Sequence, residues 1–254
     1  MSFLHALILG IVEGITEFLP VSSTAHLILT TNLLHLQETE FVKSFQIIIQ
    51  LGAILSVVVL YWKKFWNIEV LMKLAVAFFP TGIIGLTVYK LVKGYLLGNL
   101  RVVLASLLIG GIALIIFERF NKQEESEIDF SEISYKRAFL IGLFQTIAVI
   151  PGVSRSAATI VGGSLIGVRK RTIVEFSFML AVPTMLAASL LDLYKSHSAI
   201  AENVPALGVG FVVSFITAII AIKSFLAYLK KRDFTFFGWY RIALAVVYFF
   251  LFLK

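Results

Sequence analysis

The sequence has 254 residues, of which 59% are hydrophobic and 15% are charged, and its formal net charge is +7. A soluble domain is typically about 45–50% apolar and about 25% charged, so this composition excludes an ordinary soluble enzyme and indicates that lipid solvates most of the surface. The absence of cysteine excludes disulfides, thiolate nucleophiles and cysteine metal sites. We interpret the excess of lysine and arginine as a topology signal and expect no nucleic-acid partner.

In chain order, prolines and charges divide residues 1–118 into apolar segments that we predict to be helices. These segments are continuously apolar and do not alternate, which argues against a β-barrel. Several approach or reach the roughly 20 residues needed to span hydrocarbon. The expected helices of this first half are Phe3–Leu19, Ser22–Leu34, Phe45–Trp62, Val70–Leu91 and Leu100–Glu118.

A hydrophilic stretch follows, and we predict that residues 119–136 form a cytoplasmic linker. The pattern of the first half then returns in residues 137–254, which we treat as the second half of one integral membrane domain. The expected helices of this half are Ala138–Ile150, Val153–Val168, Ile173–Tyr194, Pro205–Leu229 and Phe236–Leu253.

The two halves match each other around Pro20 and Pro151, which stand 131 residues apart. The string FLP-VSSTAH aligns with VIPGVSRSAA if Gly152 is treated as one insertion. The first two segments of each half are short and joined at a proline, so we predict a re-entrant helical hairpin in each half. The three remaining crossings per half are an odd number, so the predicted fold is an all-α polytopic membrane protein with an inverted-topology repeat.

The basic residues predict the orientation of this fold. With three crossings per half, 15 lysines and arginines fall on the side of the linker, Arg241 among them, and six fall on the other side. The positive-inside rule makes the linker side cytoplasmic. We therefore expect both termini outside and the cavity between the hairpins open to the outside.

Two carboxylates precede the first proline. Glu13 and Glu17 are four residues apart and share one helix face. Charged groups inside a membrane usually face a bundle interior or a water-filled cavity, so we predict that both belong to a site. The alternative is that they lie near a helix end and reach toward water. As oxygen ligands they could also hold a divalent cation, Mg²⁺ or Ca²⁺, against a pyrophosphate.

Hydroxyl groups follow both prolines. Ser22, Ser23 and Thr24 stand at the start of one predicted helix, and Ser154 and Ser156 at the start of its counterpart. Helix N-capping explains one hydroxyl per helix, but it does not explain three in a row. A helix N-terminus favours anions, phosphate in particular, so we predict that these residues bind a phosphorylated substrate.

Arg155 is the residue that the pattern singles out most clearly, as the only basic residue deep within an apolar segment in this interpretation. Its planar guanidinium suits bidentate contact with phosphate or carboxylate. The alternative is a structural ion pair with Glu13 or Glu17 that holds the halves together, and the two roles are compatible.

His26 follows Ser22 and Ser23 by about one helical turn. Histidine is the usual general base for a serine nucleophile, so His26 is a catalytic candidate, although a lone histidine in a helix is more often structural. The sequence contains no P-loop, no dinucleotide-binding glycine motif and no spacing that specifies a zinc site.

These residues lie in motifs that resemble a known family. The strings GIVEGITEFLPVSSTAHLIL (Gly10–Leu29) and PGVSRSAATIVGGSLIGVRK (Pro151–Lys170) closely resemble the two signature motifs of the bacterial undecaprenyl-pyrophosphate phosphatase family, also called the bacitracin-resistance protein. The strings IQLGAILSVV and EFSFMLAVP also look like family segments. Ala25 and Ala157 stand where glycine is usual, which makes the local backbone geometry the point to examine.

The resemblance implies a hydrolase of the bacterial cell membrane that removes the terminal phosphate of undecaprenyl diphosphate, recycling the carrier lipid for cell-wall synthesis and giving bacitracin resistance. By motif, Glu13 and Glu17 match the acidic residues. Ser23, Thr24 and His26 match the serine–threonine–histidine motif, and Ser154 and Arg155 match the second phosphate-binding motif. The expected partners are the lipid substrate and membrane lipid, with a homodimer left open.

The sequence does not decide which group attacks the phosphate. Ser23 is the preferred nucleophile, with His26 or Glu17 handling protons, but His26 as nucleophile and a metal-activated water are alternatives. A polyprenyl-phosphate flippase or a small-molecule transporter is the competing function, because inverted repeats with hairpin tips near the midplane are transporter anatomy.

Overall fold

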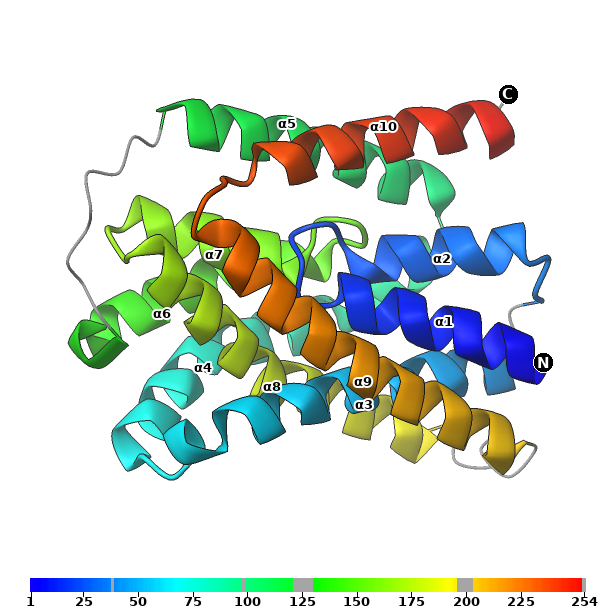
Figure 1. Ribbon diagram of the computed structural model, residues 1–254, viewed down its shortest axis with the longest axis horizontal. Helices are drawn as coiled ribbons and strands as arrows, with labels where there is room; N and C mark the ends of the chain where they lie inside the picture. The colour runs from blue at the N-terminus through cyan, green and yellow to red at the C-terminus, as the bar shows by residue number, and fades with distance from the viewer. Residues whose placement is uncertain (38, 97–98, 121–129, 196–202, 253–254) are drawn as a thin grey trace.

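The computed structural model describes residues 1–37, 39–96, 99–120, 130–195 and 203–252, and these ranges contain helices and no β-strand. Each expected segment corresponds to one α-helix (Figure 1). The helices of the first half are α1 (Phe3–Thr16), α2 (Ser23–Leu33), α3 (Glu40–Phe65), α4 (Ile68–Leu91) and α5 (Leu100–Phe120). Those of the second half are α6 (Tyr135–Gln145), α7 (Arg155–Leu165), α8 (Lys170–Lys195), α9 (Val204–Leu229) and α10 (Thr235–Phe252).

Short turns complete the described chain. A π-helical turn, η1 (Val92–Leu96), follows α4, and 3₁₀ turns form η2 (Phe130–Glu132) and η3 (Thr146–Val149). The ends of the expected linker belong to α5 and α6, whereas residues 121–129 lie outside the described residues. The helices before the two prolines are shorter than expected. Helix α1 ends at Thr16 and α6 at Gln145, whereas the expected ends were Leu19 and Ile150.

Six of the described helices are long and apolar enough to cross a membrane: α3, α4, α5, α8, α9 and α10. Three of them belong to each half, and the shorter pairs α1–α2 and α6–α7 precede them. Many large apolar side chains on the spanning helices are exposed, for example Ile109, Ile216 and Phe250. This is the surface of a protein dissolved in lipid, and the chain is an all-helical multi-pass membrane protein.

The halves interlock, and each short helix pair packs against a long helix of the other half. Helix α1 packs along α9, and α6 packs along α4. Helix α3 packs against α8, and α5 runs beside α10 along one side of the bundle (Figure 1). These contacts are reciprocal. If each helix of one half is replaced by its counterpart in the other, the pair α1–α9 becomes α6–α4, and the pairs α3–α8 and α5–α10 become themselves.

Glycines let these helices approach closely. A Cβ atom at Gly10 of α1 would lie 2.8 Å from the Gly210 carbonyl of α9. At Gly142 of α6, a Cβ atom would collide with the Ala77 backbone of α4. Small residues at such crossings allow backbones to pack in direct contact, which is the main attraction between helices in lipid. Each hairpin is thereby fixed to the opposite half.

Two spanning helices contain a proline beside the centre of the molecule. Pro80 lies inside α4 and Pro183 lies inside α8, and each is followed by a threonine, Thr81 or Thr184. A proline removes one backbone hydrogen bond of its helix, which membrane helices tolerate when neighbouring polar groups are available. Both threonines lie on the wall of the cavity described below.

Candidate active site

Each short helix pair has a tip, where its first helix gives way to its second: residues 17–24 form the first tip and residues 146–156 the second. The two tips share an unusual backbone. Ser22 caps α2 with φ 71° and ψ 92°, and Ser154 caps α7 with φ 78° and ψ 115°. The Ser22 hydroxyl accepts the Ala25 N–H at 3.4 Å, and the Ser154 hydroxyl accepts the Ala157 N–H at 3.2 Å. A positive φ is uncommon for a serine. Strained backbone of this kind is concentrated at functional sites.

A cavity of about 400 Å³ lies against both tips. The second half of α4, the second half of α8 and Gln50 of α3 form its other walls. Its polar side includes predicted residues of both tips, namely Glu17, Ser22, Ser23, Thr24, Ser154 and Arg155. The lining also includes apolar side chains, namely Phe78, Leu86, Met185, Ala187 and Ala188. A ligand that fits this space has a polar head and a greasy body.

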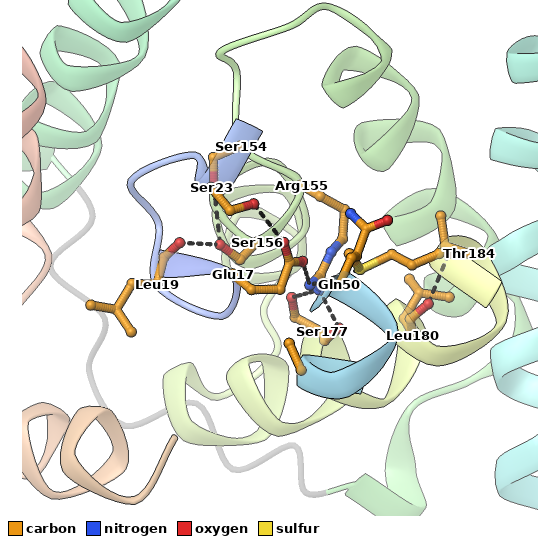
Figure 2. Close-up of polar contacts among 12 residues, drawn as sticks. Glu17, Leu19, Ser23, Gln50, Ser154, Arg155, Ser156, Ser177, Leu180 and Thr184 are labelled. Carbon is orange, nitrogen blue, oxygen red and sulfur yellow. Dashed lines mark hydrogen bonds and ion pairs between the residues drawn. The ribbon is translucent and has the colours of Figure 1, made fainter. Parts of the chain in front are cut away.

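Glu17 occupies the centre of the polar side, between the Ser23 hydroxyl and the Arg155 guanidinium (Figure 2). Ser23 Oγ donates to Glu17 Oε2 at 2.5 Å. Arg155 Nη2 donates to the other oxygen, Oε1, at 3.0 Å. A nucleophile beside a base that is itself oriented by a third group is the arrangement of an activated hydroxyl. The ion pair anticipated as an alternative for Arg155 is therefore present.

Arg155 is fixed on its far side by α8. Its Nη1 donates to the Ser177 carbonyl at 2.7 Å, and Ser177 Oγ is bound in turn to Thr159 Oγ1 at 2.6 Å. Its Nε is buried and has no hydrogen-bond partner. The residue itself lines the cavity, and a guanidinium is a strong donor to anions. Ser177 is a supporting contact of Arg155 that the sequence interpretation missed.

Glu13 lies behind this group and does not line the cavity. Its side chain is fully buried, and neither carboxylate oxygen has a hydrogen-bond partner. A buried carboxylate without a donor is costly, so an unsatisfied Glu13 indicates either a shared proton or a cation. Its helix face is that of Glu17, as the spacing predicts.

His26 faces away from the Ser23 hydroxyl. Its Nδ1 lies 2.8 Å from the Ser22 carbonyl, and its Nε2 lies 2.8 Å from the hydroxyl of Tyr240 in α10. Because a carbonyl only accepts, Nδ1 carries the proton, and Nε2 of the neutral ring accepts from Tyr240. The two rings are also stacked. His26 thus holds the first tip against α10, and it does not line the cavity.

Ser156 also lies outside the cavity wall. Its hydroxyl donates to the Leu19 carbonyl at 2.7 Å and lies 3.1 Å from the Ser154 hydroxyl. These contacts connect the second tip to the first (Figure 2). The structure therefore places Ser156 as a link between the tips, whereas Ser22, Thr24 and Ser154 line the cavity as a substrate site requires.

Arg241 requires a correction of the sequence interpretation. Its assignment to the cytoplasmic basic residues is wrong, and Arg155 is not the only basic residue deep in an apolar segment, because Arg241 is fully buried. Its nitrogen atoms donate to five backbone carbonyls, those of Pro20, Ser106, Leu107, Gly152 and Val153, at 3.0–3.3 Å. A guanidinium has five N–H donors, so Arg241 is saturated and ties both tips to α5.

Gln145 is a second residue that the sequence interpretation missed. It is buried on the cavity wall, and its Nε2 donates to Thr81 at 2.8 Å and to Thr184 at 3.2 Å. It stands 132 residues after Glu13, and Ser154 stands 132 residues after Ser22. An alignment without the insertion at Gly152 would have paired Gln145 with Glu13 and indicated a polar residue at this place.

Ala25 and Ala157, where the resemblance led us to expect glycine, need no special backbone. Ala25 and Ala157 lie in the first turns of α2 and α7, and both are buried. Among the described residues, a positive φ outside glycine occurs at Ser22, His35 and Ser154. The alanines are therefore compatible with the geometry of the tips, since ordinary helical φ suits an L side chain.

Comparison with known proteins agrees with this geometry. Residues 6–247 match the family described as bacitracin resistance protein BacA. The chain belongs to this family. It is 52% identical over 252 residues to the undecaprenyl-diphosphatase of Aquifex aeolicus (strain VF5), with 98% of each chain covered. It is 50% identical over 254 residues to the undecaprenyl-diphosphatase of Sulfurihydrogenibium sp. (strain YO3AOP1), covering 98% of this chain and 99% of that one.

The residues that could hold a metal ion are few. Within the part of the chain that the structure describes, no three His, Cys, Asp or Glu side chains come together in a group that could bind one. Glu13 and Glu17 supply at most two carboxylates, and both oxygens of Glu17 already accept from Ser23 and Arg155. A cation here would need phosphate oxygens or water to complete its coordination.

Proposed function

We propose that this membrane protein is an undecaprenyl-diphosphatase, which hydrolyses a C55 polyprenyl diphosphate to the monophosphate and inorganic phosphate. The observation that carries the proposal is the 2.5 Å hydrogen bond from Ser23 Oγ to Glu17, on a cavity wall that also presents Arg155. The relatives bear this name over nearly the full chain. In a bacterial cell membrane this reaction would recycle the carrier lipid for cell-wall synthesis and give bacitracin resistance.

In the first step, Ser23 Oγ attacks the terminal phosphorus and Glu17 accepts the hydroxyl proton. The bond from phosphorus to the bridging oxygen breaks, and the polyprenyl monophosphate leaves. Arg155 lies on the cavity wall and would contact the phosphoryl oxygens through its guanidinium. Such donors stabilise the charge that develops on the transferred group, which is the main task in phosphoryl transfer.

The second step releases inorganic phosphate. A water oxygen attacks the phosphorus of the serine-bound phosphate, and the serine–phosphorus bond breaks. Glu17 returns its proton to Ser23 Oγ, while the protons of the water remain on the phosphate product. The two helix starts support the anion in both steps, because the first N–H groups of a helix have no partner within it.

His26 is not the preferred nucleophile or base in this mechanism. Both of its ring nitrogens are engaged, one with Ser22 and one with Tyr240. We assign it the role of holding the first tip, and Ser156 a similar role in the second. Because all the reacting side chains come from one chain, the mechanism does not require a homodimer.

The apolar wall of the cavity suits the first isoprene units of the substrate. Phe78, Leu86 and Met185 contribute apolar surface to the cavity lining. The remaining tail would continue into lipid between the spanning helices. In this arrangement the diphosphate would contact Arg155 and the tail would contact hydrocarbon. The hydrophobic effect favours it because the apolar tail is removed from water.

A divalent cation, Mg²⁺ or Ca²⁺, fits one observation at the site. Both oxygens of Glu13 are buried without a donor, and hard cations prefer oxygen ligands. Glu13 and Glu17 would hold the ion together with substrate oxygens, and it would neutralise phosphate charge. If so, Glu13→Gln should insert and purify normally, lose activity steeply and lose its response to added cation. Unchanged activity of Glu13→Gln and Glu17→Gln would remove both carboxylates from the site.

We also infer that the fold is an inverted repeat with two re-entrant hairpins. The reciprocal packing of α1 on α9 and α6 on α4 supports an exchange of halves. The equal spacing of Gly10 to Gly142 and of Ser22 to Ser154 supports it too. Helices α1 and α2 have 14 and 11 residues, and each is too short to span the membrane. A hairpin that enters and leaves the membrane on one side fits these lengths.

The cavity should open to the outside of the cell. Its walls belong to the later parts of α4 and α8 and the earlier part of α3, which lie toward the end of the bundle that carries the N-terminus (Figure 1). The opposite end carries most of the basic residues even without Arg241, and the positive-inside rule makes it cytoplasmic. Cysteines placed at Ser126 and after Lys254 test this in intact cells. An impermeant thiol reagent should label only the terminal cysteine, and the reverse pattern would overturn the orientation.

The competing function, a flippase or transporter, is not favoured by the comparisons, since the relatives are named as diphosphatases. Purified protein in detergent, a polyprenyl diphosphate and a free-phosphate readout decide the matter. We expect phosphate release that Ser23→Ala abolishes. No release, with or without divalent cation, would contradict the enzyme and leave transport as the better account.

A further inference from the structure

A second pocket lies at the other end of the same helices that enclose the candidate active site. Its volume is about 610 Å³. Its walls are the end of α3, the start of α4, the turn η2 and the start of α8. On α3, for example, Gln50 lines the first cavity, whereas Lys63 and Lys64 line this one. We call it the basic pocket.

The charges of the basic pocket favour an anion. Its lining includes five basic side chains, Lys63, Lys64, Lys73, Arg169 and Arg171, and two carboxylates, Glu69 and Glu175. Glu175 accepts from Lys64 at 2.6 Å and from Arg171 at 3.3 Å. Basic side chains therefore outnumber carboxylates by five to two in the described lining, and this local charge favours an anionic group.

One of these basic side chains, Lys73, is buried in the wall of the pocket. Lys73 is 3% exposed, although its partner Glu69 on the same helix is exposed. Thr172, at the start of α8, is also buried and lines the same space. The Lys73 ammonium is held by Glu69 at 2.7 Å, so an anionic ligand in this pocket would lie beside a cation that the fold already keeps in place.

The surroundings place the pocket at the depth of lipid headgroups. Trp62 and Trp66 flank Lys63 and Lys64 in the sequence, and both indole side chains are exposed. Exposed tryptophans concentrate at the boundary between hydrocarbon and water. Val70 and Phe130 add apolar surface to the same lining. A headgroup phosphate can therefore reach the cations while its acyl chains stay in the bilayer.

We propose that the basic pocket binds the headgroup of an anionic phospholipid in the leaflet opposite the candidate active site. Basic pockets between membrane helices on the cytoplasmic side bind such headgroups. Free phosphate shares the headgroup chemistry but gains nothing from the tryptophans and the apolar lining. The lipid would tie α3, α4 and α8 together at one end, and these helices form walls of the reaction cavity at the other.

The test measures lipid binding to the full chain in detergent. Native mass spectrometry gives the apparent affinity for dioleoylphosphatidylglycerol and for the zwitterionic dioleoylphosphatidylcholine, which has the same acyl chains. Lys63→Gln/Arg169→Gln removes two charges from the pocket. Lys230→Gln/Lys231→Gln removes two exposed charges at the end of α9, outside it. Lys63→Gln alone is a milder variant at an exposed position in case the double variant folds poorly.

We expect phosphatidylglycerol to bind more tightly than phosphatidylcholine. The pocket double variant should weaken that binding by roughly 30-fold, because each basic side chain near the membrane surface adds to the attraction of anionic lipid. The matched control should change it less than threefold. Phosphate release from the polyprenyl diphosphate should stay within about twofold, since neither charge pair touches the reaction cavity.

Three outcomes would overturn the proposal. Equal affinity for the two lipids would show that the pocket does not select anionic headgroups. Equal losses in the pocket and control variants would show general attraction to a basic surface. Displacement of phosphatidylglycerol by millimolar inorganic phosphate, with the same stabilisation by phosphate alone, would make this a site for the free anion.

Discussion

The two hairpin tips have the same backbone and different chemistry. Ser22 and Ser154 cap their helices with nearly equal positive φ, and each hydroxyl accepts the N–H three residues later. The next residue is Ser23 in the first tip and Arg155 in the second. Glu13 in α1, the helix before the first tip, corresponds in spacing to Gln145 in α6, the helix before the second. The first half therefore contributes carboxylates and the proposed nucleophile, and the second contributes a cation and an amide.

The difference between the tips makes each of them depend on the other for charge compensation. A carboxylate or a guanidinium buried without a partner is strongly unfavourable. Glu17 from one tip and Arg155 from the other satisfy each other at 3.0 Å. In the proposed mechanism, the serine–glutamate pair supplies the nucleophile and the proton acceptor, and Arg155 supplies donors for the phosphate. Substitutions that change one tip and leave the other intact can therefore separate nucleophile, phosphate contact and scaffold.

The largest effect is expected from Ser23→Ala in the first tip. The substitution removes the attacking oxygen and leaves Glu17 with Arg155, so turnover should fall by at least about 10⁴-fold, as for other serine nucleophiles. Steady-state phosphate release measures this. Thr24→Ala is the matched control, because Thr24 is the adjacent hydroxyl on the same cavity wall and should lose far less. Comparable losses in both variants, or substantial turnover in Ser23→Ala, would remove Ser23 as the nucleophile.

The next effect concerns the cation of the second tip. Arg155→Lys keeps the charge near Glu17 but loses the planar fork and its Nε–H. We expect kcat to fall about 10²–10³-fold, the loss seen when one transition-state donor is removed, while yield and thermal stability hardly change. Kinetics and a thermal melt measure the two parts. If Arg155→Lys is fully active, or unfolds and is rescued by Glu17→Gln, then Arg155 is a strut between the tips.

A smaller loss is expected from Arg241→Lys, which weakens the common support of both tips. Lysine offers three N–H donors where Arg241 uses five, so buried carbonyls at Pro20 or Gly152 lose a partner. The tips should shift slightly, and kcat should fall about 10–10²-fold with little change in KM. Thermal stability should fall as well. A stability loss with unchanged kcat in the folded fraction would mean that Arg241 supports the fold without positioning the tips.

Much of this site is predictable from local sequence. The prolines at Pro20 and Pro151 mark the tips, and apolar length marks the spanning helices. Glu17, Ser23 and Arg155 stand out because polar side chains are rare in lipid-facing sequence. Their proximity follows once the two halves are assumed to meet, because the hairpins bring equivalent helix starts to one cavity.

The supporting contacts are not predictable in this way, since they join residues far apart in the chain. Arg241 resembles a topology signal near a helix end, and only its packing against carbonyls of both tips reveals its role. The partner of His26 is Tyr240, on the last helix. A histidine beside serines suggests a catalytic pair by spacing, but the helix directs the ring toward α10 and away from Ser23.

The smallest effect is expected at Ala25 and Ala157, the two alanines at the starts of α2 and α7. Ala25→Gly and Ala157→Gly each remove one buried methyl group, and both positions already have helical backbone. Glycine in a helix costs up to about 1 kcal/mol relative to alanine, less near the first turn, so each variant should melt slightly lower. Turnover should stay within about twofold, because Ser22 and Ser154 keep their positive φ and their hydrogen bonds. A change of tenfold or more in turnover for either variant would mean that the methyl group sets the position of its tip. The shared backbone of the two tips would then be tuned separately in each half, and the comparison between them would have to include these methyl groups as well as the charged side chains.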